Sequence, residues 1–584
     1  MKDKINNIFT DKTAKTNAII CLLFLVLYLY IGFCIPYYDD DWIAGGPYGW
    51  FITFSGCANG RYVGNIILDL LAHSRFLKTI VMGTVSLLIP YEIAIIGCEF
   101  NTVIFRFKFI LFNVLLMLID FQMWSEIYGW VSGFGIYAVI GLLMIYYIRL
   151  HDDLFVGESG KTEHRWYYYI GLFLFAIIMQ LFLENIALAF ILLGFLGLLF
   201  SVKFKINIAK HLVLFIGNVI GIILLFSNGM IRELFVTGAS VDDRHLSVDV
   251  SATLSQKIIK IFNSFFGETW LSVWNRDYYF TMILMALLVV DIILIKKSFK
   301  KIDVLALCFM VALCVNYIFN FVFIFMEAMK IDDNKVVFFM VAFSVICFIL
   351  WFIVSKKIKL SFQLGLIDHL SVFLSFLAAV LGAYYLFIAG LMYLVLSLFI
   401  VYWSYRTLEK KYSNMLFFII LFMLSHTAPL AVVTENSPRL IYHGVILVLM
   451  IISIMANYLL SKDIVMDSIR NKLSEKKNLR KAKTYFGIGL ALLILSIIIP
   501  VTYEYGLNIR RERIISELKE TQGTELIIPR YAISYRLYDY ADSFHITNVY
   551  RFYRYYGIAD DVSLYLDDEE KYNGDGSLKD MPPY

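Results

Sequence analysis

Long apolar segments separated by short polar ones run along most of this chain of 584 residues. Each segment holds roughly 20 predominantly apolar residues, which is enough for a helix to cross the hydrocarbon layer of a bilayer. The sequence shows no long alternation of apolar and polar residues, so the pattern favours helices over the strands of an outer-membrane barrel. We predict about fifteen membrane-spanning helices, at residues 16–36, 78–98, 109–121, 131–148, 167–183, 186–200, 212–226, 279–295, 304–325, 336–354, 370–401 (two spans), 415–428, 440–460 and 485–501.

Composition and charge agree with this prediction. Hydrophobic residues make up 60% of the chain and the mean hydropathy is +0.73, whereas about half apolar is usual for a soluble protein. Four lysines precede the first span, and every second loop is rich in Lys and Arg. Because such basic loops stay in the cytoplasm, we expect a multi-pass protein of the cytoplasmic membrane. Its amino terminus should then be cytoplasmic and its carboxyl terminus extracytoplasmic.

The amino-acid composition changes after the last apolar segment of the chain. Residues 502–584 mix polar and apolar positions, are rich in tyrosine and end in a stretch with many turn-forming residues. This pattern is typical of a small folded unit with both helix and strand. We therefore expect an all-α polytopic membrane domain at residues 1–501, followed by a small extracytoplasmic α+β appendage at residues 502–584.

The first predicted outer loop carries three successive acids, Asp39, Asp40 and Asp41, followed by Trp42. A carboxylate in hydrocarbon costs several kcal/mol, so acids at the end of a span face water or a protein cavity. Two interpretations remain open for this loop. It is either a solvated acidic loop anchored by interfacial aromatic residues, or a cluster of acids that performs catalysis or binds a ligand at the membrane surface.

Other polar side chains gather at the predicted outer ends of the spans, which places the expected function on the extracytoplasmic side. The candidates for substrate or phosphate binding are Arg61, Asn65, Trp130, Tyr137, Glu184, Asn185, Arg244 and Arg439. Several have a purely structural alternative: Glu184 and Asn185 as a polar turn, Arg439 as a snorkelling side chain, and the glycine-rich segment around Gly133 as a helix-packing surface. The seven cysteines show no CxxC or Cys/His spacing, so we expect neither a disulfide framework nor a metal site.

Taken in order, these motifs resemble a known family. They are DDDW, GRYVGN, a W-x-x-G-x-x-x-Y motif ending at Tyr137, F-x-E-N ending at Asn185, and Pro438-Arg439 before a span. The set is similar to the bacterial polytopic glucosyltransferase-like proteins of the GtrII type, and to the broader GT-C class of membrane glycosyltransferases. The resemblance covers roughly residues 20–460, and residues 502–584 lie outside it.

The resemblance implies that the protein transfers a sugar from a polyprenyl-phosphate carrier to an acceptor outside the cytoplasmic membrane. Asp40 and Asp41 match the acidic pair of the family, and Asp39 is an additional acid here. Displacement at an anomeric carbon needs a base for the acceptor hydroxyl and a positive environment for the departing phosphate. Aspartates suit the first need, while Arg61, Arg439 and Arg244 suit the second. Glu184 and Asn185 would orient the donor or the acceptor, and a single displacement would invert the anomeric centre.

The expected partners are a polyprenyl-phosphate sugar donor, a cell-envelope glycan acceptor and membrane lipids, with no nucleic acid and no cofactor or metal. Two other functions remain open. A transporter or flippase would show paired broken helices with charges near the middle of the membrane. A polysaccharide polymerase or ligase for lipid-linked saccharides would share the outer location and the lipid-phosphate substrate.

Overall fold

The computed structural model of the chain describes residues 11–47, 49–54, 59–157, 165–228, 253–295, 300–328, 333–357, 365–432, 437–462, 476–529, 546–559 and 561–567. Within these residues, all regular structure except one pair of strands is helical. Helices dominate because every backbone N–H and C=O of a membrane segment must find its partner inside the protein.

The amino-terminal part starts with a long helix whose N-cap, Asp11, accepts a hydrogen bond from the backbone N–H of Thr13 at 2.7 Å. The elements of this part are α2 (Lys12–Cys34), α3 (Asp40–Ala44), α4 (Gly49–Phe54), α5 (Tyr62–His73), α6 (Arg75–Ala94), α7 (Val103–Leu118), α8 (Phe121–Ile127), α9 (Val131–Gly133), the π-helical η1 (Phe134–Ala138), α10 (Val139–Arg149), α11 (Asp152–Val156), α12 (Trp166–Gln180), α13 (Glu184–Phe204) and α14 (Ile208–Phe226).

The second half of the chain is also mainly helical and ends in a small unit with two strands. Its elements are α16 (Leu254–Ser264), the π-helical η2 (Phe265–Trp270), α17 (Leu271–Asn275), α18 (Tyr278–Val290), the π-helical η3 (Asp291–Ile295), α19 (Lys301–Ala328), α20 (Asp333–Lys357), α21 (Leu366–Tyr384), α22 (Leu386–Thr407), α23 (Lys410–Thr427), the 3₁₀ helices η4 (Ala428–Val432) and η5 (Pro438–Ile441), α24 (Tyr442–Leu460), α26 (Lys476–Thr521), β1 (Glu525–Pro529), α27 (Ile546–Tyr556) and β2 (Ser563–Asp567).

Eleven helices of the described part are long and apolar enough to cross a membrane, so the chain is a helical, multi-pass membrane protein. They are α2, α6, α9 to α10, α13, α14, α19, α21, α22, α23 with η4, η5 with α24, and α26. The prediction that residues 370–401 hold two helices is confirmed, because α21 ends at Tyr384 and α22 begins at Leu386. The four other predicted spans overlap the helices α7, α12, α18 and α20, and the count of fifteen spans stays a prediction.

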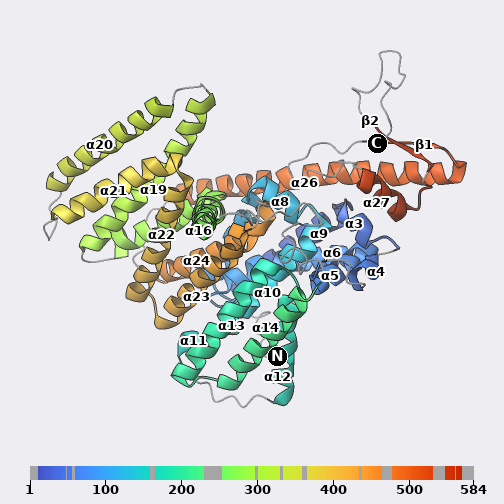
Figure 1. The fold of residues 1–584 in the computed structure, drawn as a ribbon, viewed down its shortest axis with the longest axis horizontal. Coiled ribbons are helices and arrows are strands. Elements are labelled where there is room, and N and C mark those ends of the chain that lie inside the picture. The colour runs from blue at the N-terminus through green and yellow to red at the C-terminus, as the bar shows by residue number, and fades with distance from the viewer. Residues whose placement is uncertain are drawn as a thin grey trace.

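The helices group around a buried central helix. Almost every residue of α24 is buried, as expected for a helix that is apolar on all sides and surrounded by other helices. Figure 1 shows α19, α20 and α21 packed together on one side, α12, α13 and α14 at the bottom, and α3 to α6 on the other side. The long helix α26 runs along the upper edge and exposes apolar side chains such as Leu492 and Ile499.

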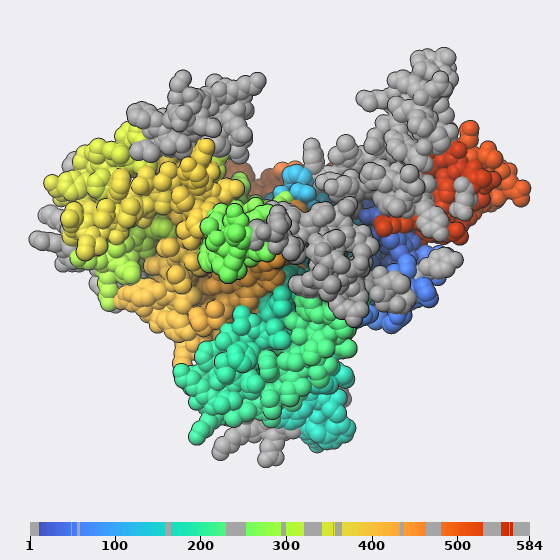
Figure 2. Space-filling view, viewed as in Figure 1, coloured from blue at the N-terminus to red at the C-terminus, as the bar shows by residue number. Residues whose placement is uncertain are grey.

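The carboxyl-terminal unit consists of the end of α26, β1, α27 and β2. The two strands are parallel, with Glu525 opposite Ser563 and Pro529 opposite Asp567, and a parallel pair needs a crossover such as the one that contains α27. The expected boundary between residues 501 and 502 lies inside α26, which continues without a break. In Figure 2 the red carboxyl-terminal unit lies against the blue amino-terminal region, where α27 packs on α3.

Candidate functional site

The three aspartates lie in what we call the acidic loop, residues 37–47, which begins soon after α2 ends at Cys34. Asp39 has a φ of 40°, a backbone conformation that residues with a side chain adopt rarely. The short helix α3 then begins at Asp40. As a result, the three side chains enter different surroundings.

Asp41 points into the protein and is fully buried. One of its oxygens, Oδ1, accepts hydrogen bonds from the backbone N–H of Ser132 at 2.8 Å and from the Ser132 hydroxyl. The other, Oδ2, accepts one from the backbone N–H of Tyr38 at 3.0 Å. Burial raises the pKa of Asp41 to about 7, although the hydrogen bonds from Ser132 and Tyr38 oppose this change and the nearby Asp40 charge adds to it. Asp41 therefore links the acidic loop to the segment that contains Ser132.

Asp39 and Asp40 point outward and share one cation. Arg551 Nη1 lies 2.6 Å from Asp39 Oδ1 and 3.3 Å from Asp40 Oδ1. The Asp39 side chain is 18% exposed and that of Asp40 is 47% exposed, so Asp40 is the most accessible of the three acids. Arg551 lies on α27, 512 residues from Asp39, and the sequence analysis did not select it. The only signal for it in the sequence is its place among the aromatic residues of YRFYRYY.

Two of the sequence-predicted residues, Arg61 and Glu184, form a bidentate ion pair. Arg61 Nε donates to both carboxylate oxygens at 3.0 and 3.1 Å, and Arg61 Nη2 donates to Glu184 Oε2 at 2.8 Å. Both side chains are mostly buried, which strengthens such a fork-like contact. One turn along α5, Asn65 donates to Asn59 Oδ1 at 3.2 Å. The pair joins the start of α5 to the start of α13.

Next to Glu184, a row of buried polar side chains extends toward the centre of the protein. Asn185 Nδ2 lies 2.9 Å from His426 Nε2, and the rings of His426 and His443 are 5.3 Å apart. His443 Nε2 lies 3.1 Å from the carbonyl oxygen of Tyr137. These contacts bring together residues of α13, α23, α24 and η1, and two of them, Asn185 and Tyr137, were expected from the sequence.

Arg439 and Trp130 form a second arginine site. The guanidinium carbon of Arg439 lies 5.5 Å from the centre of the Trp130 ring, a cation–π geometry. Glu126 holds the adjacent backbone, because its Oε2 accepts hydrogen bonds from the Ser437 hydroxyl at 2.5 Å and from the Arg439 N–H at 3.2 Å. The Arg439 side chain thus packs on a protein ring, and its role in phosphate binding stays a prediction.

Residues 126–138, which we call the connector, hold these groups together. Gly133 allows a close approach within it, because a Cβ at this position would lie 1.8 Å from the carbonyl oxygen of Glu126. The connector also includes the π-helical turn η1, a distortion that is frequent at functional sites. It contacts three of these groups: Asp41 through Ser132, Arg439 through Trp130, and His443 through the carbonyl of Tyr137.

A further arginine that the sequence analysis missed, Arg276, lies beside this region. Its Nε donates to Asp120 at 2.9 Å and its Nη2 donates to Gln122 at 2.9 Å. Arg276 and Ser437 both line a small pocket, whose other lining residues are Thr269, Ser272, Leu430, Leu440 and Ile441. Hydroxyl groups and a guanidinium in one hollow can bind an anionic oxygen.

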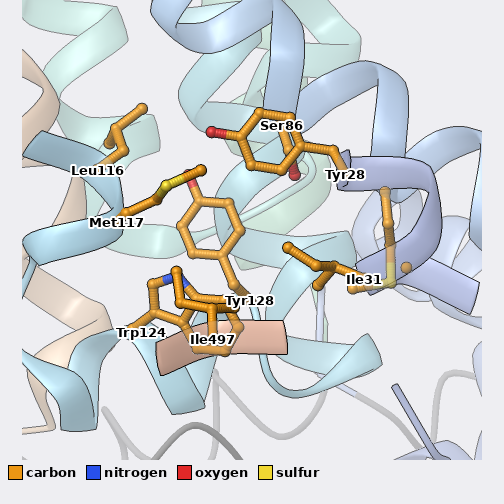
Figure 3. A pocket seen from close by; sticks show the side chains of 10 residues that line it. Tyr28, Ile31, Ser86, Leu116, Met117, Trp124, Tyr128 and Ile497 are labelled. Atoms are coloured by element: carbon orange, nitrogen blue, oxygen red, sulfur yellow. The ribbon is translucent and has the colours of Figure 1, made fainter. Parts of the chain in front are cut away.

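An apolar crevice lies between α2, α6, α7, α8 and α26. Figure 3 shows the rings of Tyr28 and Tyr128 in its middle, with Met117 on one side and Ile31 on the other. Tyr128 also exchanges a hydrogen bond of 2.6 Å with Tyr442. The crevice therefore reaches from α2, which precedes the acidic loop, to Tyr128 of the connector.

The remaining predicted residue, Arg244, lies outside the described residues. Within the described ranges, no group of three or more His, Cys, Asp or Glu side chains is arranged to hold a metal ion. No protein-family model, no curated protein and no solved structure matches the chain.

Proposed function

We propose that this protein is a membrane glycosyltransferase that moves a sugar from a polyprenyl-phosphate carrier to an extracytoplasmic cell-envelope glycan or lipid-linked acceptor. The proposal includes a GT-C-like arrangement of about fifteen spans, a cytoplasmic amino terminus and an extracytoplasmic carboxyl terminus in the cytoplasmic membrane. One observation carries it: the connector joins the acidic loop, through Asp41, to the arginine site of Arg439. Displacement of a phosphate at an anomeric carbon requires a base and a positive environment for the phosphate, and the connector contacts both an acid and an arginine.

In the proposed reaction, Asp40 accepts the proton of the acceptor hydroxyl while the hydroxyl oxygen attacks the anomeric carbon. The bond from that carbon to the carrier phosphate breaks, its electron pair goes to the phosphate oxygen, and the polyprenyl phosphate leaves. A single displacement of this kind inverts the anomeric configuration. Asp40 receives the role of base because it is the most exposed of the three acids, whereas the buried Asp41 positions the loop.

The arginines supply the positive environment for the phosphate. We assign the carrier phosphate to Arg439 and to the neighbouring pocket lined by Arg276 and Ser437, because guanidinium groups bind phosphate oxygens in a fork geometry. Arg61 holds Glu184 in place, so Glu184 and Asn185 are assigned to the sugar or the acceptor.

The test uses the full-length protein, purified in lipid nanodiscs, with a polyprenyl-phosphate sugar and an acceptor glycan. Asp40→Asn should lower the transfer rate by about 10²–10⁴-fold, the usual contribution of a general base. Asp152→Asn is the matched control, because Asp152 is a half-exposed acid on α11 that pairs with Lys411 at 3.4 Å. Product stereochemistry, read by NMR, should show inversion, and retention would exclude the direct displacement.

Transport is the outcome that would replace this proposal. Movement of a lipid-linked saccharide across vesicle membranes without any glycosidic bond formation would identify a flippase. The orientation has its own test, since Pro47 is exposed in the acidic loop. In a cysteine-free background, Pro47→Cys should react with a membrane-impermeant maleimide from outside the cell, and reaction only from inside would reverse the topology.

A further inference from the structure

The carboxyl-terminal unit packs against the acidic loop through apolar side chains. Trp42 of the loop is 3% exposed and belongs to the same apolar cluster as Leu526, Phe552 and Leu564 of the unit. The rings of Trp42 and Phe552 are 5.1 Å apart in an edge-to-face arrangement, which is favourable for aromatic pairs. Part of the core of the unit therefore comes from the other end of the chain.

A glycine makes this approach possible. A Cβ at Gly45 would lie 2.5 Å from the ring of Tyr555, and the Tyr555 ring also lies 6.0 Å from that of Tyr37. Tyr555 of α27 thus lies against both ends of the loop segment that contains the three acids. The loop and the unit fit each other closely along this stretch.

Arg551 adds a polar contact in the middle of this interface. Its Nη1 bridges Asp39 and Asp40, so one positive charge offsets the repulsion between two adjacent carboxylates. Asp39 also has the unfavourable φ of 40°, and a residue keeps such a strained conformation only where its surroundings restrain it. The ion pair supplies that restraint from outside the loop.

We propose that Arg551 is a positioning residue of the candidate site, through which the carboxyl-terminal unit holds Asp39 and Asp40 in their observed orientation. The inference rests on the proposed function in one respect, which is that Asp40 takes the acceptor proton. It assigns a role to the carboxyl-terminal unit, which completes the site from the opposite end of the chain. Arg551→Lys keeps the charge but loses the planar guanidinium, so it should retain part of the effect.

The first experiment is independent of any enzymatic activity. Hydrogen exchange of peptides that cover residues 37–47 is measured by mass spectrometry in the full-length protein. Arg551→Met should speed exchange in these peptides at least tenfold, and Arg551→Lys should speed it less. Arg513→Met is the control, because Arg513 is exposed on α26 of the same unit and makes no ion pair among the residues that the structure describes. Unchanged exchange in both Arg551 variants would overturn the inference.

The second experiment measures transfer. Arg551→Met should lower kcat about tenfold to a hundredfold with little change in KM, and should move the acid limb of the pH–rate profile to higher pH, whereas Arg513→Met should leave both unchanged. A purely structural role would lower the amount of active protein without moving the pH profile, and that result would overturn the positioning role. If the unmodified protein transfers no sugar, the proposed function fails, and the exchange experiment alone decides whether Arg551 fixes the loop.

Discussion

Replacing Asp41 by asparagine tests how burial controls the charge of the acidic loop. Asparagine has the same size and can keep the two hydrogen bonds that Asp41 Oδ1 accepts from Ser132. Its NH₂ group would face the N–H of Tyr38, which now donates to Oδ2. The lost hydrogen bond costs about 1–3 kcal/mol at every pH, so Asp41→Asn should be less stable than the unmodified protein at low pH.

The difference in the free energy of unfolding between the unmodified protein and the Asn variant should change with pH. Burial raises the pKa of Asp41 to about 7, whereas an aspartate in an unfolded chain titrates at about 3.9. The folded state therefore binds the proton more tightly, and this stabilisation is complete below the unfolded pKa and is lost as the pH rises through the folded one. Between pH 5 and pH 8 the unmodified protein should lose about 3 kcal/mol that the Asn variant keeps.

The assay is thermal unfolding in detergent at pH 5, 6, 7 and 8, with both proteins heated at one fixed rate because membrane proteins often unfold irreversibly. The midpoint of the unmodified protein should fall relative to that of the Asn variant as the pH rises from 5 to 8, because a loss of about 3 kcal/mol is large enough to cancel or reverse an advantage of about 1–3 kcal/mol at low pH. Glu99→Gln, at an exposed carboxylate, should show no such trend. An advantage of the unmodified protein that grows with pH would refute the reasoning, because the hydrogen bonds would then hold Asp41 ionised.

Three further predictions follow from the packing and ion pairs. Arg61→Lys should lose the bidentate contact with Glu184 and destabilise the fold by about 1–3 kcal/mol, and a double-mutant cycle with Glu184→Gln should show coupling of similar size. Gly133→Ala should reduce folded protein sharply, because a Cβ would lie 1.8 Å from a carbonyl oxygen, whereas Gly171→Ala, with no atom within 4 Å, should be neutral in the same fluorescence size-exclusion assay. For Asp153, burial opposes ionisation, but hydrogen bonds from histidine and asparagine and a nearby lysine outweigh it and lower the pKa. This carboxylate should therefore stabilise the protein at neutral pH and lose its contribution on acidification, so that Asp153→Asn flattens the acid side of a stability–pH curve.

The membrane part of the fold follows closely from the sequence. An apolar segment of about 20 residues in lipid has to satisfy its own backbone hydrogen bonds, and the helix is the local solution. Helices therefore lie at the predicted positions, and even the break inside residues 370–401 is where the pattern puts it. The domain boundary that the change in composition predicts between residues 501 and 502 stays a prediction, and the helix α26 runs across it from Lys476 to Thr521.

The contacts within the candidate site could be predicted from the sequence much less well than the positions of the helices, because they depend on the tertiary structure. Hydropathy and motif order selected Asp39 to Asp41, Arg61, Glu184 and Arg439, since polar residues at the ends of spans are costly and therefore conspicuous. The sequence could not state that Arg61 binds Glu184, or that Asp41 turns inward toward Ser132 while its two neighbours face outward. Side-chain direction in a loop depends on a few backbone angles, such as the φ of Asp39, which no periodicity encodes.

Composition and periodicity thus determined by themselves that this is a helical membrane protein with acids and arginines near the ends of its spans, because lipid imposes a local rule on every residue of a span. Only the tertiary structure decided which of those charges meet. Arg551 and Asp39 are 512 residues apart, and their contact exists because α27 packs on α3. Such long-range packing is the sum of many weak contacts, none of which leaves a signal at a fixed spacing in the sequence.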